Sequence, residues 1–198
     1  GKPQVTGNIR LGIPSEFSTT LMPKIIRRFT QTYPEISLEV HCALSKDLLS
    51  EPLKSQFDLI LSLQETPDPQ QDGYIISDQL VWVGSQRFVN SVPAKLPIIA
   101  APSPCIYRKR ATNLLSAIKK PWQVVYTIAD LNGIQTAINE GLGITVLAKS
   151  SVPPGLHVLS NSESLPELGH VGVCLVNPQK VSSKAISLLT ETITNEVA

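Results

Sequence analysis

The apolar positions in the first part of the chain switch between the period of a strand and that of a helix. Every second residue from Asn8 to Ile13 is apolar, which predicts a strand. Apolar residues then recur every four positions from Leu21 to Tyr33, which predicts an amphipathic helix beginning at Thr19 or Thr20. Pro23 has to lie in the first turn of such a helix, because an interior proline removes a hydrogen bond. A second alternating strand is expected over 36–43.

The next segments complete a first α/β unit. Ser45 is the expected N-cap of a short helix that runs through Leu53. The apolar run 57–63 predicts a strand buried on both faces, and the proline- and glycine-containing stretch 65–73 predicts a surface loop. Three strands separated by helices predict a parallel sheet.

The same alternation then repeats in the second half of the chain. Strands are expected at 79–84, 96–101, 124–128, 144–148, 156–159 and 171–176. Ser103 as N-cap and Pro104 at the first helical position predict a helix that ends before Pro121. The inward face of this helix is predicted to consist of Tyr107, Ala111, Leu114 and Ile118.

Two further helices have clear boundaries. Asp130 is the expected N-cap of a helix that Gly141 ends as the C′ residue. A last helix is predicted over 181–196. The residues predicted to face inward are Leu131, Ile134, Ala137 and Ile138 in the first of these helices, and Ala185, Ile186, Leu189 and Ile193 in the second.

Two such units predict an α/β protein with two Rossmann-like lobes and an interlobe cleft. Lobe I is expected over 1–76 and 168–198, and lobe II over 77–167. Ligands of open α/β sheets bind at the carboxyl ends of the strands, where helix N-termini favour acceptor-rich groups. These ends are expected at 14–18, 43–45, 101–105 and 127–130. The alternative, that Ser15, Ser45, Ser103 and Asp130 only cap their own helices, stays open.

Composition and charge indicate a folded domain without a general affinity for nucleic acid. Hydrophobic residues make up 42% and charged residues 17%, and the formal net charge is +1. The longest apolar stretch, 141–148, is too short to cross a bilayer. The first twelve residues lack the pattern of a signal peptide. Three widely spaced cysteines favour reduced thiols and a cytoplasmic location.

The residues offer no constellation for catalysis. His41, His157 and His170 have no liganding neighbours at metal spacing, and no phosphate-binding or nucleophile motif occurs. We therefore expect no enzyme activity and no cofactor. The basic runs 27–28 and 108–110 are interpreted as solvated helix faces.

Cys105 is expected one or two residues inside a helix start and near two basic residues, a setting that lowers a thiol pKa. A redox switch is one interpretation of this cysteine. A buried, unreactive thiol is the other, because no second cysteine lies near it in the sequence.

Several short strings occur in an order and spacing known from one family. The chain resembles the effector-binding domain of LysR-type transcriptional regulators, and segments 104–108, 121–122 and 125–127 resemble the LrhA/HexA-like branch. The strings that carry the family resemblance are GNIRLG at 7–12, LMP at 21–23, Phe29 with YPE at 33–35, FDLIL at 57–61 and EGLGI at 140–144.

The resemblance implies a fold like that of type 2 periplasmic binding proteins, with a small-molecule effector in the interlobe cleft. Family members commonly have serine or threonine where Asp130 stands, which leaves the charge of the effector open. Cys105 lies near the peroxide-sensing cysteine of OxyR-like members, whose partner cysteine is absent here. Carried over by position, the implied effector contacts are Ser15, Glu16, Phe17, Ser18, Ser45, Ser103, Pro104, Cys105, Thr127, Ile128 and Asp130.

The resemblance also implies partners. Domains would pair side by side and antiparallel, so that helix 20–33 of one copy meets helix 131–140 of another, and the full-length protein would form dimers and tetramers. Promoter DNA would bind only through an N-terminal winged helix-turn-helix that this chain lacks, and RNA polymerase is a further candidate partner. No membrane partner is expected. The alternative function is that of a periplasmic-type solute-binding protein, which an export signal in the full gene would indicate.

Overall fold

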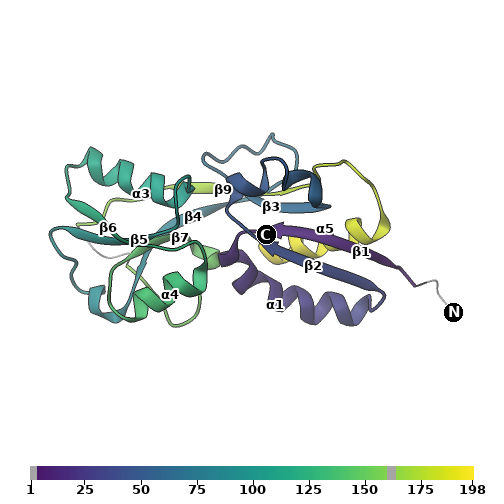
Figure 1. Cartoon of the computed structure of the whole chain (residues 1–198), viewed down its shortest axis with the longest axis horizontal. Coiled ribbons are helices and arrows are strands. Elements are labelled where there is room, and N and C mark those ends of the chain that lie inside the picture. Colours follow the sequence, from purple (N-terminus) through teal and green to yellow (C-terminus); the bar gives the residue numbers. More distant parts are fainter. Residues whose placement is uncertain (1–3, 160–163) are drawn as a thin grey trace. The chain divides into compact units, whose positions relative to one another are not determined.

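The computed structural model describes residues 4–159 and 164–198 (Figure 1). The chain divides into two compact units. Unit 1 comprises Gly1–Ser77 and Gly172–Ala198, and unit 2 comprises Asp78–Val171. The mixture of helices and strands in each unit matches the predicted α/β class.

Unit 1 is built around parallel strands. β1 pairs in parallel with β2 on one side and β3 on the other, and β9 pairs antiparallel with β3. The parallel pairing of these three strands confirms the prediction from the sequence. The elements of unit 1 are β1 (Gly7–Ile13), α1 (Ser15–Thr32), β2 (Ile36–Cys42), α2 (Ser45–Leu48), η1 (Lys54–Gln56), β3 (Leu59–Gln64), β9 (His170–Val176) and α5 (Lys184–Val197).

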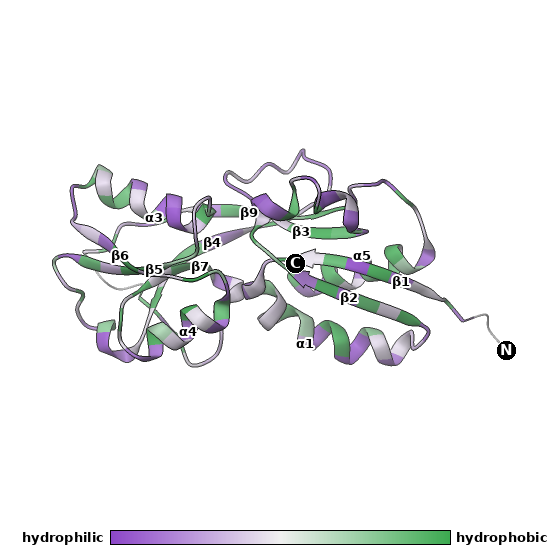
Figure 2. Cartoon of the chain, viewed as in Figure 1, coloured by the Kyte–Doolittle hydropathy of each residue, from purple (hydrophilic) through white to green (hydrophobic). Residues whose placement is uncertain are grey.

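The core of unit 1 lies between the sheet and its two long helices. α1 and α5 contact each other, and α5 also contacts β1 (Figure 1). In Figure 2 the ribbon of β1 and β3 is coloured mostly as hydrophobic, whereas α1 alternates between hydrophobic and hydrophilic residues. α5 buries Ala185, Ile186, Leu189 and Ile193, the four residues that its pattern predicts. A smaller cluster of Leu48, Phe57 and Ile60 also belongs to this unit.

Unit 2 contains an antiparallel group and a parallel pair of strands. β4 pairs antiparallel with β7 and β8, and β5 pairs in parallel with β6. The predicted inward residues of α4 are all buried, in a core shared with Val81, Val83 and Ile99. The elements are β4 (Tyr74–Gly84), η2 (Gln86–Phe88), β5 (Leu96–Ala100), α3 (Ile106–Ala117), β6 (Trp122–Thr127), α4 (Leu131–Asn139), β7 (Thr145–Ala148), η3 (Lys149–Ser151) and β8 (His157–Val158).

Two strands carry the chain from one unit to the other. β4 passes the boundary between Ser77 and Asp78, and β9 passes that between Val171 and Gly172. β4 begins at Tyr74, five residues before the expected strand, because it extends back into unit 1. We call β4 and β9 the crossing strands.

The start of α1 differs from the prediction. The helix begins at Ser15, with Pro14 as an extended N-cap whose carbonyl accepts hydrogen bonds from the N–H groups of Phe17 and Ser18 at 3.1 and 3.0 Å. Pro23 therefore lies well inside the helix, not in its first turn. The loss of one backbone hydrogen bond is offset because α1 buries an apolar face that includes Leu21.

The start and the buried face of α3 also differ from the prediction. Cys105 is the N-cap, so Ser103 and Pro104 lie in the preceding loop and are joined by a cis peptide bond. The preference for serine at an N-cap is a weak local bias that the path of the chain overrides here. α3 ends at Ala117, which leaves Ile118 53% exposed, and its buried residues are Ala111 and Leu115.

Candidate functional site

The carboxyl ends of β1 and β2 lie at the same edge of the unit 1 sheet. Ile13 pairs with Cys42 in the parallel register, and the N–H of Ala43 donates to the carbonyl of Ile13 at 3.3 Å. α1 begins at Ser15 and α2 at Ser45, directly after these strands. The structure therefore brings together two of the predicted site segments, 14–18 and 43–45, within unit 1.

The first turn of α1 combines buried and half-buried side chains. No described side chain caps this helix, and Ser15 and Ser18 are half-buried. Glu16 is 9% exposed and Phe17 is 2% exposed. The ring of Phe17 belongs to the core, and its N–H donates to the carbonyl of Pro14 at 3.1 Å, so this residue holds the first turn in place. The carboxylate of Glu16 lies at the positive end of the helix dipole, which favours a negative charge.

Ser45 does not cap α2 as predicted. Leu44 occupies the N-cap position, and Ser45 is the first helical residue. Its Oγ accepts a hydrogen bond from the N–H of Leu63 at 3.3 Å. Leu63 lies near the end of β3, so this hydroxyl links α2 to a third strand end at the same edge. The helix is only four residues long and ends at Leu48, before the expected end at Leu53.

Unit 2 repeats this arrangement with β5 and β6. Ala100 pairs with Thr127, and the N–H of Ile128 donates to the carbonyl of Ala100 at 3.0 Å. The loops 101–105 and 128–130 therefore leave the sheet next to each other and lead into α3 and α4. The buried hydroxyl of Thr145 donates to the carbonyl of Ile99 at 2.6 Å and so fixes β5 just before its end.

The predicted site residues of unit 2 differ in exposure. Ser103, Pro104, Thr127 and Asp130 are exposed, and Cys105 and Ile128 are half-buried. Ile128 packs against the core of unit 2, so it supports the loop more than it presents a surface. Cys105 stands at the N-cap, outside the first helical turn in which the sequence interpretation placed it.

Asp130 caps α4 as predicted. Its Oδ1 accepts a hydrogen bond from the N–H of Gly133 at 2.8 Å. The carboxylate also offsets the partial positive charge at the start of this helix. Capping is therefore one role of Asp130, and it leaves the second carboxylate oxygen for other interactions.

The basic run 108–110 was interpreted as a solvated face, and this is wrong for two of its three residues. Arg108 Nη1 donates to the carbonyl of Ala101 at 3.2 Å. Arg110 Nη1 donates to the carbonyls of Leu168 and His170 at 2.7 and 3.1 Å. Both arginines are half-buried. No signal in the sequence could identify the bonds of Arg110, because its acceptors lie 58 and 60 residues away along the chain.

Cys174 and His41 lie outside the four predicted segments, in β9 and β2. Burial, and to a smaller extent the negative charge of Asp68, raises the pKa of the Cys174 thiol above its usual value. The ring of His41 lies 5.6 Å from that of Phe57, centroid to centroid. Within residues 4–159 and 164–198, no three His, Cys, Asp or Glu side chains are placed to hold a metal ion.

The comparison with known families identifies the family of the chain. Residues 2–198 match the LysR substrate binding domain. The chain belongs to this family. The two pairs of strand-to-helix junctions thus lie in a domain whose family is defined by ligand binding.

Relatives of this LysR-type domain are transcriptional regulators. The chain is 26% identical over 190 residues to the HTH-type transcriptional regulator DgdR of Burkholderia cepacia, a match that covers 96% of this chain and 64% of DgdR. The chain thus spans somewhat less than two thirds of the length of this relative.

Solved structures share the fold at low sequence identity. The regulatory domain of Synechocystis PCC6803 CcmR in complex with 2-PG superposes with a TM-score of 0.68 at 16% identity, covering 96% of this chain and 97% of that one. The effector-binding domain of QuiR in complex with shikimate gives 0.68 at 14% identity, with the same coverage. The predicted type 2 periplasmic-binding-protein-like fold is confirmed. The comparisons do not separate the LrhA/HexA-like branch from others, so that assignment stays a prediction.

Proposed function

We propose that this chain is the effector-sensing domain of a longer DNA-binding transcription regulator, and that the predicted strand-to-helix segments contain its effector contacts. The observation that carries this proposal is the pairing of the predicted segments: 14–18 with 43–45 in unit 1, and 101–105 with 127–130 in unit 2. Each pair stands at the carboxyl ends of neighbouring parallel strands, where open α/β sheets bind ligands.

The eleven residues do not contribute in the same way. Ser103 and Thr127 offer exposed hydroxyls, and Asp130 offers one carboxylate oxygen beyond its capping bond. Phe17 supports the turn, since its ring is buried and its N–H is bonded to the carbonyl of Pro14. The loops around these groups are shaped by Glu16, Pro104, Cys105 and Ile128. The effector itself is a small molecule held by hydroxyl and backbone donors, as the serines at positions 15, 18 and 45 suggest.

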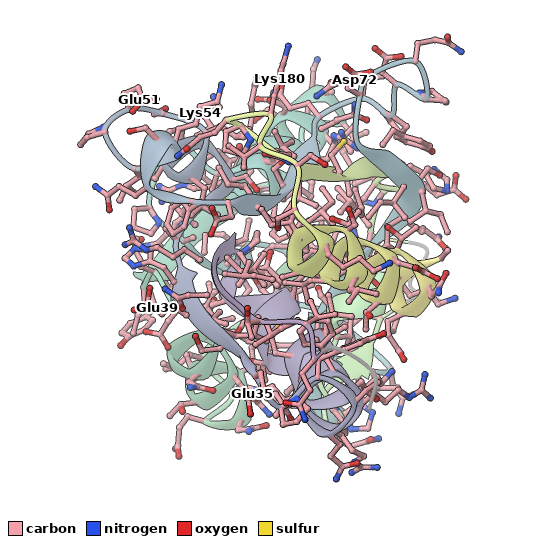
Figure 3. All side chains as sticks on the ribbon, turned by 90° about the vertical axis from the view of Figure 1, so that its right-hand side faces the viewer. Glu35, Glu39, Glu51, Lys54, Asp72 and Lys180 are labelled. Atoms are coloured by element: carbon pink, nitrogen blue, oxygen red, sulfur yellow. The ribbon has the colours of Figure 1, made fainter. Side chains whose placement is uncertain are left out.

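The sensing step requires no bond-making by the protein. A ligand that binds one conformation more tightly than another raises the population of that conformation. In the full-length regulator this shift would reach an N-terminal winged helix-turn-helix that binds promoter DNA, with RNA polymerase as a further partner. The mixture of acidic and basic side chains that project from unit 1, among them Glu51, Lys54 and Lys180, fits a domain that does not itself bind DNA (Figure 3).

Self-association belongs to the same proposal. We infer that α1 of one copy packs against α4 of a second copy. Ile26 on α1 is 49% exposed, and Leu142, three residues after the end of α4, is also 49% exposed, so an exposed apolar side chain lies on α1 and another lies close to α4. None of the helices in the described ranges has the length and apolar character needed to cross a bilayer. We propose a cytoplasmic location, as for a regulator of transcription.

The test is a ligand screen followed by site variants. Purified protein is screened by thermal shift against small carboxylates, amines and polyols, shikimate among them, and hits are measured by isothermal titration. For a true effector, Ser103→Ala and Thr127→Ala should each weaken binding by about tenfold, the effect of losing one good hydrogen bond to a buried ligand. Ser187→Ala, at an exposed position of α5, is the matched control. A ligand that binds all three variants with unchanged affinity would contradict the proposed site.

A further inference from the structure

Helix α3 connects the loop 101–105 to a distant part of unit 2 through two arginines. Arg108 Nη1 donates to the carbonyl of Ala101 at 3.2 Å, at the start of that loop. Arg110 Nη1 donates to the carbonyls of Leu168 and His170 at 2.7 and 3.1 Å. A guanidinium is a rigid planar donor, so these bonds fix direction as well as distance.

The acceptors of Arg110 flank a bend at the entrance to a crossing strand. Gly169 lies between them with a φ of +74°, and its own carbonyl accepts the N–H of Leu80 at 2.8 Å. Three consecutive carbonyls of this bend are therefore held, two by α3 and one by β4. His170 is the first residue of β9, which carries the chain from unit 2 into unit 1.

Arg110 and the proposed effector contacts share one short stretch of helix. The carbonyl of Cys105, the N-cap of α3, accepts the N–H of Lys109 at 3.0 Å. Arg110 follows Lys109 directly and lies five residues, about one and a half helical turns, after Cys105. Because hydrogen-bonded turns move as rigid bodies, a displacement of the loop at Cys105 also displaces the Arg110 side chain.

We propose that Arg110 is a positioning residue that couples the loop 101–105 to the Leu168–His170 bend and thereby to crossing strand β9. The coupling rests on the proposed function only in that the loop is where the effector acts. Its physical basis is the pair of hydrogen bonds from one guanidinium to the two carbonyls of the bend. Arg108 contributes to the same coupling, since its hydrogen bond to the carbonyl of Ala101 links the first residue of the loop to α3.

The coupling can be measured without knowing the effector. The probe is a loop substitution, Ser103→Gly, which adds backbone freedom at an exposed position. The readout is amide hydrogen exchange of Leu80, whose N–H is bonded to the bend, with the Leu175 amide of unit 1, which bonds to Gly73, as reference. We expect Ser103→Gly to speed exchange at Leu80 at least about threefold relative to Leu175.

A double-mutant comparison isolates the role of Arg110. In an Arg110→Met background the effect of Ser103→Gly on Leu80 should vanish, and in Arg110→Lys it should shrink, because an ammonium cannot reproduce the planar donor pair. Arg110→Lys also serves if Arg110→Met fails to fold. The matched control is Arg87→Met, which removes a guanidinium bond of 3.0 Å to the carbonyl of Gly141 elsewhere in unit 2. The effect of Ser103→Gly should persist in that background.

Two results would overturn the proposal. One is that Ser103→Gly leaves Leu80 exchange unchanged in the otherwise native chain. The other is that its effect is the same with and without Arg110. Since the experiment contains no ligand, its failure would leave the proposed effector site untouched, and failure to find an effector would leave the measured coupling intact.

Discussion

The side chain of Ile128 lies over Gly133, in the space that a larger residue at position 133 would need. A Cβ built at Gly133 would overlap Ile128 Cδ1 and lie 2.9 Å from Cγ1. A glycine inside a helix normally costs stability relative to alanine, so its presence in the first turns of α4 has a packing reason. The glycine allows the strand-to-helix loop 128–130 to pack closely on α4.

Gly133→Ala should therefore destabilise the protein in spite of the higher helix propensity of alanine. We expect a loss of about 1–2 kcal/mol in the free energy of unfolding, the usual cost of a modest overpacking. Urea unfolding measures it. Ile128→Val removes Cδ1, the atom of closest overlap, so in that background Gly133→Ala should cost less, although Cγ1 still lies 2.9 Å from the added Cβ. Equal costs in the two backgrounds would show that the contact is not responsible.

The cap of α4 gives a second prediction. Asp130→Ala should lower the free energy of unfolding by about 1 kcal/mol, because the N–H of Gly133 loses its side-chain acceptor. Asp130→Asn retains an acceptor oxygen and should cost only a few tenths of that amount. Ser183→Ala, which removes the cap that accepts from Ile186 N at 3.1 Å in α5, is the comparison in unit 1. If Asp130→Asn were as destabilising as Asp130→Ala, a charge interaction would be the cause.

The three thiols should react in order of their exposure. Cys42 is exposed, Cys105 is half-buried and Cys174 is buried, with its thiol pKa raised by burial and then by Asp68. Alkylation with iodoacetamide at pH 8, followed by mass spectrometry, should modify Cys42 first and leave Cys174 unmodified in the folded protein. Rapid labelling of Cys174 in the native protein would contradict its burial.

The raised pKa of Cys174 also has a consequence for stability at alkaline pH. In the unfolded chain the thiol ionises near its usual value of 9.0, whereas the folded protein retains the proton to higher pH. The unfolded state then binds fewer protons, so stability falls as the pH rises above about 9.0. Cys174→Ala should reduce this pH dependence, measured by urea unfolding between pH 8 and 10. If the free energy of unfolding of Cys174→Ala fell with pH as steeply as that of the native protein, other titrating groups would be the cause.

Gly73 is predicted to tolerate substitution less well than another glycine of similar conformation. Its φ is +85°, and a Cβ there would overlap the carbonyl oxygen of Leu175 in the neighbouring crossing strand. Gly155 has a φ of +91° with nothing within 4 Å of a Cβ. Gly155→Ala should cost about 1 kcal/mol from backbone strain alone, and Gly73→Ala should cost at least about 1 kcal/mol more. Thermal unfolding of the two variants tests the difference.

The proposed self-association is tested on the exposed face of α1. Light scattering on the 21.5 kDa chain should report a dimer, and Ile26→Asp should shift it to the monomer by placing a charge in an apolar interface. Ile118→Asp, at a position 53% exposed on the other unit, should leave the dimer intact. A monomer for the native chain at high concentration, or identical behaviour of both variants, would contradict the role of α1.

Helices with a regular apolar period and a side-chain cap had boundaries and buried faces that the sequence predicts. Features that depend on contacts between distant residues could not be predicted in this way. α4 and α5 bury the residues that their apolar periodicity indicates, and Asp130 caps one of them as expected. α1 begins earlier than predicted, at Ser15, although no described side chain caps it; its first helical hydrogen bonds go to the carbonyl of Pro14, which almost any residue can provide. Without a side-chain cap, no local pattern marks this helix start.

The same distinction holds for the candidate site. The rule that ligands bind at the carboxyl ends of parallel strands predicts which loops to consider, and the registers of β1 with β2 and of β5 with β6 place those loops in pairs. The links made by Ser45 and Arg110 were not predictable. Each depends on a partner that tertiary folding brings near: the amide of Leu63 for Ser45, and the carbonyls of the 168–170 bend for Arg110.

Unit 1 is assembled from the two ends of the chain, Gly1–Ser77 and Gly172–Ala198, with all of unit 2 between them. The apolar face of the unit 1 sheet stays exposed to solvent until α5 packs on β1 and contacts α1. During synthesis on the ribosome, all residues of unit 2 are therefore available for folding before α5, the last helix of unit 1, has been made. A nascent chain that stops before Lys184 would release a complete second half attached to an incomplete first half.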